Sequence, residues 1–184
     1  MTERIIIAGF GGQGVLSLGQ FIAYAANNNG MYVTWLPSYG PEMRGGTANC
    51  SVVVSDKPVA SPLIPSGDTL IAMNKPSLDK FIGSVKAGGL VIINSSLISE
   101  KVERKDIKVC YIDANDIANE AGNSRTANIV ILGAYIRLKG ILDKGEVLKV
   151  IEEIFASKPK VIPMNLKAFE MGYEKAVKYR NNSK

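Results

Sequence analysis

A chain of 184 residues, 46% hydrophobic and 21% charged, can bury a core without disulfides or metals, so we expect a single domain over residues 1–184. The net charge of +5 invites a nucleic-acid interpretation, yet basic and acidic residues cancel, eleven against eleven, up to Ile136. The excess lies in the last 48 residues among interleaved acids, which is typical of solvated helical faces and argues against nucleic-acid binding.

Strand and helix signals alternate along the chain and predict a three-layer α/β/α domain with a largely parallel or mixed sheet and a Rossmann-like start. An apolar strand at 4–8 leads through glycines into a helix at 15–29, and a second strand follows at 31–36. The glycine- and proline-containing segment 38–46 is predicted as a loop. Further strands are expected at 47–56, 69–74, 89–94 and 108–113, and further helices at 76–85, from 114 with Asp113 as a cap, at 124–139, at 144–156 and from 165.

The stretch IIIAGFGGQGV, residues 5–15, is typical of a buried strand that runs into a glycine-rich turn and then a helix. Gly9, Gly11 and Gly14 have the GxGxxG spacing in the strand-to-helix context of phosphate-binding turns. Glycines allow positive φ angles and let a phosphate approach bare amides at the positive end of the helix dipole. The turn is therefore a candidate anion site.

A nicotinamide or flavin dinucleotide also needs an acidic residue about 20 positions further on to hold its ribose. No charged residue of either sign lies between Arg4 and Glu42, and the second strand ends in Leu36, Pro37 and Ser38. This disfavours an autonomous Rossmann-type dinucleotide-binding protein or dehydrogenase, which stays open as an alternative. A glycine turn with a purely structural role is another.

The helix after the turn, VLSLGQFIAYAANNNG, carries no charged residue. A helix on the surface of a monomer normally presents a charged face to water, so we expect this helix to be covered on all sides. A domain of this size shields only one or two faces of a helix, which favours a second polypeptide as the cover. The alternative is a central helix enclosed by this domain alone.

No histidine occurs in the chain, which excludes Ser-His-Asp triads, histidine bases and zinc sites built on histidine. Cys50 and Cys110 form no CxxC pair, so we expect buried, reduced thiols. The apolar start Ile5–Ala8 is broken by glycines and does not resemble a signal peptide, and the most apolar window, Val15–Ala26, is too short for a bilayer. We therefore expect a cytoplasmic protein that does not contact a membrane.

Gly67-Asp68 and Asn94 have the spacing of a thiamine diphosphate motif. The match fails at Thr69, where the motif has a second glycine, and at Ser95, where it has a second asparagine. Chance spacing is the better interpretation, so the chain is not expected to hold thiamine diphosphate by itself.

The segments GFGGQGVLSLGQFIA and PSYGPEMRGGTANCSVVVSD, followed by Ser61-Pro62, resemble the gamma subunit of 2-oxoacid:ferredoxin oxidoreductases over nearly the whole chain. The YGPEMRGG form is more similar to the branches acting on 2-oxoglutarate or branched-chain 2-oxoacids than to those acting on pyruvate. The resemblance implies oxidative decarboxylation of a 2-oxoacid, with 2-oxoglutarate as the expected substrate. Coenzyme A would take the acyl group and ferredoxin would take two electrons, in an anaerobic-type enzyme of which this chain is a subunit that is inactive alone.

The same resemblance implies a division of work among subunits. Thiamine diphosphate and Mg²⁺ are expected on alpha and beta chains and iron-sulfur clusters on other partners, among them a ferredoxin-like delta chain. This chain would bind no cofactor tightly and would share coenzyme A as a substrate. When isolated, it could pair with itself as a homodimer.

In relatives of this kind the glycine loop lies near coenzyme A, which implies a cofactor-binding set of Gly9, Gly11, Gly12, Gln13, Gly14 and Arg44. Backbone amides of the turn would hold phosphates, and the Arg44 guanidinium would bind a phosphate or the substrate carboxylate. An ion pair of Arg44 with Glu42 or with a neighbouring chain fits the sequence equally well. A pure assembly subunit with an empty glycine turn also stays open, and no catalytic residue or metal ligand is expected.

Overall fold

A computed structural model describes residues 1–40 and 46–180. Its six strands form one sheet in the order β2-β3-β1-β4-β5-β6. The strands are β1 (Thr2–Phe10), β2 (Tyr32–Tyr39), β3 (Thr47–Ser55), β4 (Gly67–Ala72), β5 (Val85–Asn94) and β6 (Lys108–Ile112). The helices are α1 (Val15–Asn28), α2 (Lys75–Phe81), α3 (Ala114–Ala121), α4 (Ala127–Lys139), α5 (Lys144–Ile154) and α6 (Ile162–Arg180), with short 3-10 turns η1 (Ile82–Ser84), η2 (Ser124–Thr126) and η3 (Pro159–Val161).

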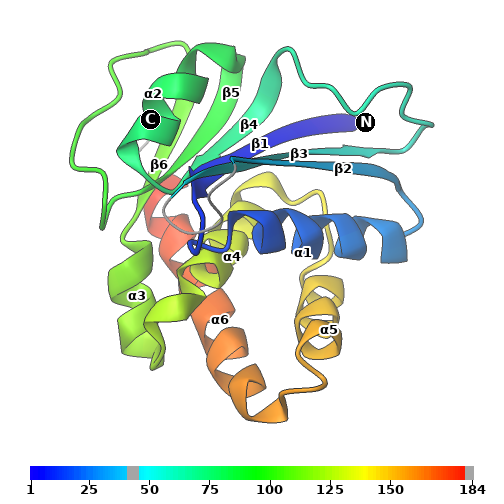
Figure 1. The fold of residues 1–184 in the computed structure, drawn as a ribbon, viewed down its shortest axis with the longest axis vertical. Helices are drawn as coiled ribbons and strands as arrows, with labels where there is room; N and C mark the ends of the chain where they lie inside the picture. Colours follow the sequence, from blue (N-terminus) through cyan, green and yellow to red (C-terminus); the bar gives the residue numbers. More distant parts are fainter. Residues whose placement is uncertain (41–45, 181–184) are drawn as a thin grey trace.

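The sheet is mixed and mostly parallel. β1, β4, β5 and β6 run parallel to one another, and β3 runs antiparallel to both of its neighbours, β1 and β2. Figure 1 shows α1, α3, α4, α5 and α6 on one side of the sheet and α2 on the other. The predicted α/β architecture is therefore confirmed, with one thick helical layer and one thin layer.

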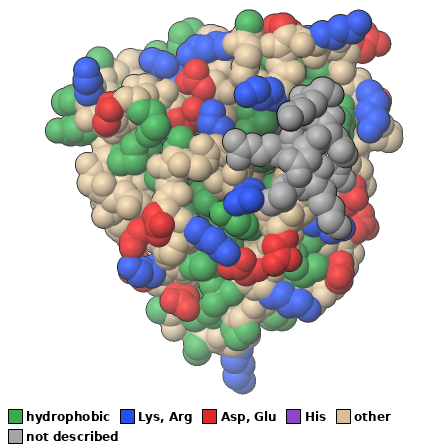
Figure 2. Space-filling view, turned by 180° about the vertical axis from the view of Figure 1, so that it is seen from behind, with side chains coloured by type: hydrophobic (Ala, Val, Ile, Leu, Met, Phe, Trp, Pro, Cys, Tyr) green, Lys and Arg blue, Asp and Glu red, His purple; other side chains and the backbone are tan. Residues whose placement is uncertain are grey.

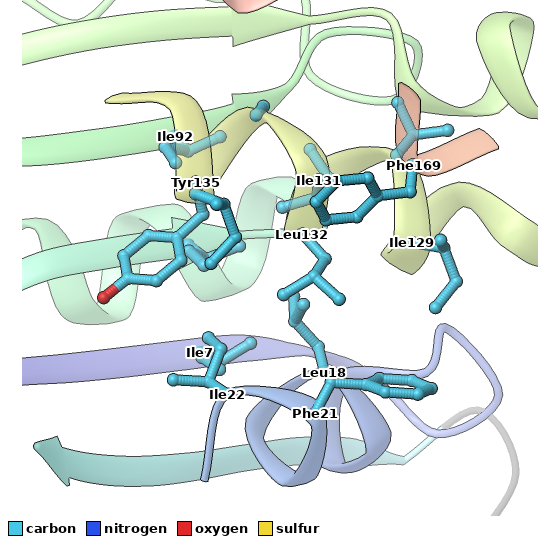
Figure 3. Close-up of a cluster of buried hydrophobic side chains, with 14 of the residues drawn as sticks. Ile7, Leu18, Phe21, Ile22, Ile92, Ile129, Ile131, Leu132, Tyr135 and Phe169 are labelled. Atoms are coloured by element: carbon cyan, nitrogen blue, oxygen red, sulfur yellow. The ribbon is translucent and has the colours of Figure 1, made fainter. Parts of the chain in front are cut away.

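The thick layer holds the larger core because successive side chains of a strand point to opposite faces. Ile5 and Ile7 of β1 face the helices, whereas Ile6 belongs to a smaller cluster under α2. Figure 3 shows Leu18 and Ile22 of α1 among the buried side chains between the sheet and α4. Burial of each such aliphatic side chain stabilises the fold by about 1.5–3 kcal/mol, which fixes α1 and therefore the turn that precedes it.

The second strand differs from the expected Rossmann-like arrangement. β2 does not pair with β1, because the antiparallel β3 lies between them, with Val52 opposite both Ile5 and Trp35. The end of β2 is thus two strands away from the glycine turn. A carboxylate there would not lie where a dinucleotide ribose requires it, so the missing acidic residue agrees with the topology.

Other expectations hold within a few residues, apart from one cap. β2 continues to Tyr39, into the predicted loop, and α2 ends at Phe81, where η1 takes over the predicted helix. Asp113 occupies the N-cap position of α3, but its side chain accepts a hydrogen bond from Ser95 Oγ instead of capping the helix. The prediction of Asp113 as a side-chain cap was therefore wrong, because the strand end beside it offers a competing donor.

Both cysteines are buried free thiols, as predicted. Burial raises the pKa of Cys50 to about 12, although hydrogen bonding from Trp35 and the backbone of Gly19 opposes the shift. Burial also raises the pKa of Cys110 to about 12. Thiols of this kind are protonated at neutral pH and behave as small hydrophobes.

Lys, Arg, Asp and Glu are interspersed over the face seen in Figure 2, without a field of one sign, which agrees with the interpretation of the net charge. Among residues 1–40 and 46–180, no helix has the length and apolarity to cross a membrane, and no three metal-ligating side chains cluster.

Candidate functional site: an anion cradle at two helix N-termini

The glycine turn lies at the carboxyl edge of the parallel strands, between the end of β1 and the start of α1. β1 and β4 are parallel neighbours, and the chain leaves them in opposite directions, through α1 to β2 and through α2 to β5. Such a switch point leaves a crevice outside the strand ends, which is where open α/β sheets bind ligands. The topology therefore supports the turn as a binding site.

Most of the predicted glycines serve the local packing. A Cβ on Gly9 would lie 2.7 Å from Gln13 Oε1, and a Cβ on Gly14 would lie 2.5 Å from Asn128 Nδ2. The Gly11 amide is taken by the carbonyl of Gly46, at 2.9 Å. These three positions shape the turn from inside.

Gly12 is the exposed crest of the turn. Its φ is +98°, a conformation that favours glycine, and a Cβ there would meet no heavy atom within 4 Å. Within residues 1–40 and 46–180, no protein acceptor takes the amides of Gly12 or Gly14. Gly12 is thus the position where a ligand can approach bare backbone.

Gln13 makes hydrogen bonds on both sides of the turn. Its side chain points inward, because Oε1 accepts from the amide of Phe10 at 2.7 Å and Nε2 donates to the carbonyl of Met73 at 3.3 Å. Its own amide donates to the Phe10 carbonyl at 3.1 Å. Gln13 therefore closes the turn through hydrogen bonds within the chain, and its predicted contact with a ligand stays a prediction.

Two helix N-termini meet at this point. Asn128, in the first turn of α4, donates from Nδ2 to the carbonyl of Gly14 at 3.3 Å, although the two residues are 114 positions apart. Neither α1 nor α4 has a side-chain cap or an acidic residue in its first turn. The N-terminus of α1 therefore keeps unpaired amides, whereas Asn123 Oδ1 accepts from the Arg125 amide and caps the η2 turn that leads into α4. The positive ends of both helix dipoles lie at this point, which creates a site suited to an anion.

Arg125 supplies a full positive charge at the same place. It lies in η2, directly before α4, and is exposed.

Two clefts meet between Arg125 and Gly12. The long cleft, of about 260 Å³, has a polar rim of Gly12, Ser17, Gln20, Arg125, Asn128 and Asn165 and an apolar wall of Phe21, Ile129, Ile154 and Phe155. The short cleft, of about 140 Å³, is lined by Gly12, Gln13, Met73, Asn115, Ser124, Arg125 and Ala127.

The sequence analysis identified the turn but not the residues that η2 and α4 add to the candidate site. Arg44 lies outside the described residues, so its predicted role stays a prediction. Arg125 and Asn128 were placed only at the start of a helix. The available signal was one basic residue before the long uncharged segment TANIVILGAYI, and nothing local to that segment connects it to the turn.

Comparison with known proteins assigns the family. A family profile described as pyruvate ferredoxin/flavodoxin oxidoreductase matches residues 4–175. The chain belongs to this family. It is 42% identical, over 95% of its length, to ketoisovalerate oxidoreductase subunit VorA of Methanothermobacter marburgensis, of which it spans 37%. It is 37% identical to 2-oxoglutarate synthase subunit KorC of Methanocaldococcus jannaschii, over 96% of this chain and 95% of that one.

Solved structures of the family agree with this assignment. The gamma subunit of a keto/oxoacid ferredoxin oxidoreductase from Geobacter sulfurreducens superposes with a TM-score of 0.81 at 32% identity, covering 96% of this chain and 99% of that one. A chain of the 2-oxoglutarate:ferredoxin oxidoreductase from Magnetococcus marinus, solved with 2-oxoglutarate, coenzyme A and succinyl-CoA, superposes with a TM-score of 0.89 at 26% identity. This chain covers only 31% of the Magnetococcus chain, just as it spans about a third of VorA. The resemblance to the gamma subunit is confirmed.

Proposed function

We propose that this chain is the gamma subunit of a thiamine-dependent 2-oxoacid:ferredoxin oxidoreductase and forms one side of its coenzyme A site. The enzyme would convert a 2-oxoacid of the 2-oxoglutarate or branched-chain type to acyl-CoA and pass two electrons to ferredoxin. Relatives named for ketoisovalerate and for 2-oxoglutarate both align with the chain, so the proposal covers both substrate types. Thiamine diphosphate, Mg²⁺ and the iron-sulfur clusters would reside on alpha, beta and delta partners in the cytoplasm.

The observation that carries the proposal is the anion cradle. Gly12 offers bare backbone at the uncapped N-terminus of α1, and Arg125 of η2, just before α4, lies beside it. Coenzyme A carries phosphates that such a cradle suits, and it requires no carboxylate at the end of β2. The Rossmann-type alternative has no comparable support, because β3 separates β2 from β1.

Replacing Gly12 by valine is expected to raise the KM for coenzyme A at least tenfold in the reconstituted complex. A β-branched residue at φ +98° strains the turn and places methyl groups where a phosphate approaches the amides. The KM for the 2-oxoacid should stay unchanged. Gly88→Val is the matched control, because Gly88 also has a positive φ, +77°, and open space, but lies at the other end of the sheet. Equal effects of Gly12→Val on both substrates would refute the site.

The size of the clefts implies a second wall. Drug-sized ligands occupy pockets of about 300–1,000 Å³, and coenzyme A is larger than most of them, whereas the long cleft holds about 260 Å³. We infer that the rest of the molecule lies against a partner subunit. The same partner would border α1, because Ser17 and Gln20 belong to both the long cleft and the outer face of that helix.

The outer face of α1 has the character of an interface. Tyr24 is 53% exposed, so this fold alone does not enclose the helix, and the alternative of a central helix is wrong. The exposed and half-buried residues of the helix include no charged side chain, whereas the neighbouring α5 presents Lys144, Glu146, Lys149, Glu152 and Glu153. Depletion of charge with retention of aromatic residues distinguishes interface cores from ordinary surface.

Gln20→Glu is accordingly expected to weaken assembly with the partner chains by about tenfold or more, because a lone carboxylate would be buried in the interface. The measurement is the dissociation constant of the complex, obtained from sedimentation or native mass spectrometry of the co-expressed chains. Asn119→Asp, which adds the same charge on an exposed position of α3, serves as the control. Normal assembly of the Gln20 variant would contradict burial of this face.

A further inference from the structure

The side chain of Gln13 also hydrogen-bonds to a residue outside the glycine turn, Asn74. Besides accepting from the Phe10 amide, Gln13 Oε1 accepts from Nδ2 of Asn74 at 3.1 Å. The absence of a Cβ at Gly9 leaves the space that this oxygen occupies. The amide of Gln13 is therefore fixed on one side by β1 and on the other by the chain that follows β4.

Asn74 is 5% exposed and uses both ends of its amide. Its Oδ1 accepts from the amide of Ser77 at 3.0 Å and so caps α2, while its Nδ2 donates to Gln13. The carbonyl of Asn74 also accepts from the amide of Leu78 at 3.1 Å. The orientation of the Asn74 amide is thus set by the helix that it caps.

Capping alone does not require asparagine at this position. Aspartate and serine cap helices about as well, but neither carries an N–H group that could reach Gln13. With aspartate at position 74, a carboxylate oxygen would face Gln13 Oε1, and Gln13 would have to turn its amide over. After that rotation its NH₂ group would face the Phe10 amide, and the bond that closes the turn would be lost.

We propose that Asn74 is a positioning residue of the anion cradle, which holds Gln13 so that the turn presents the Gly12 amide to the clefts. The inference rests on the proposed function for its consequence in binding, but the hydrogen-bond chain from Asn74 through Gln13 to Phe10 stands on geometry alone. Because α2 lies on the other side of the sheet, these hydrogen bonds connect the anion cradle to both helical layers of the fold.

The test in the reconstituted complex is Asn74→Asp, which keeps the cap and removes the donor. The KM for coenzyme A should rise about 3- to 10-fold, the range expected for loss of one buried neutral hydrogen bond. The KM for the 2-oxoacid should stay unchanged, and the midpoint of thermal unfolding should fall by no more than about 6 °C, because the same hydrogen bond also stabilises the fold. Asp143→Asn is the matched control, because Asp143 caps α5 through the amide of Glu146 and makes no contact with the turn. Equal rises in both KM values would overturn the proposal.

Amide hydrogen exchange of the isolated full-length chain provides a second readout that is independent of coenzyme A. Exchange at Phe10 should accelerate about 3- to 10-fold in Asn74→Asp, since its acceptor is Gln13 Oε1, and should not change in Asp143→Asn. Unchanged protection of Phe10 would overturn the proposal. Faster exchange together with an unchanged KM for coenzyme A would support the hydrogen-bond chain and contradict the proposed coenzyme A site.

Discussion

Replacing Gly133 of α4 by alanine is expected to lower the free energy of unfolding by about 3 kcal/mol or more. A Cβ at this position would lie 2.1 Å from the carbonyl oxygen of Phe169 in α6, a distance that no side-chain carbon adopts. The partner position behaves alike, because a Cβ on Gly172 would lie 2.0 Å from the carbonyl of Val130. The obstacle on each side is backbone, so the two helices must separate.

The sign of this effect opposes intrinsic helix propensity, which favours alanine over glycine by about 1 kcal/mol. Gly83→Ala is the control, since a Cβ there meets nothing within 4 Å, and its stability should change by less than about 0.5 kcal/mol. Thermal unfolding measures both, with an expected decrease of about 6–12 °C for Gly133→Ala. A variant as stable as the wild type would show that α4 and α6 do not cross as closely as described. Since α4 carries Asn128 at its N-terminus, loosening this crossing should also disturb the cradle.

The fold was largely predictable because its elements are specified locally. Apolar runs such as residues 69–74 and 89–94 mark buried strands, and glycines after Ala8 mark the turn, so the predicted elements agree with the observed ones. The order of strands was not predictable in this way. The position of β3 between β1 and β2 depends on pairing across the whole sheet. Neither segment contains a sequence pattern that predicts the pairing of Val52 with Ile5.

The site was predictable only where neighbours in sequence form it. The spacing of Gly9, Gly11 and Gly14 identified the turn, but it did not separate the glycines that pack inward from Gly12, which is exposed. Gln13 was included because it belongs to the same motif; two of its hydrogen-bond partners, Met73 and Asn74, lie about 60 positions away and were not predictable from its neighbours. Residue type alone does not show whether an amide faces a ligand or its own fold.

The absence of charge between Arg4 and Glu42 has two separate consequences in the folded chain. At the start of α1 it leaves the helix dipole without an acidic cap, so the first-turn amides remain available to an anion. Along the outer face of α1 it leaves a surface whose burial would require no desolvation of ions. Under the proposed function, binding and assembly would therefore both depend on this one segment, and the cation that completes the site, Arg125, comes from another part of the chain.

Arg125→Glu is expected to have the largest effect on coenzyme A, with a rise in its KM of about 100-fold in the reconstituted complex. Loss of a charge-assisted hydrogen bond costs about 1.5–3 kcal/mol, or roughly 10- to 150-fold, and the new carboxylate also repels a phosphate. The KM for the 2-oxoacid should change little, because the thiamine adduct would form on a partner subunit. Arg125→Lys should retain part of the affinity, as a point charge without the planar fork of donors.

Lys57→Glu separates this local effect from a change in overall charge. Lys57 is exposed and follows β3 at the end of the sheet remote from the glycine turn, and its reversal alters the net charge by the same amount. Its KM for coenzyme A should match that of the wild type. Salt provides a second criterion, because added salt should raise the wild-type KM for coenzyme A by screening the arginine, whereas the Arg125→Glu variant should not show this rise. If Arg125→Glu and Lys57→Glu have the same KM for coenzyme A, the cradle does not hold a phosphate through Arg125. The contact of η2 with the glycine turn would then serve only packing.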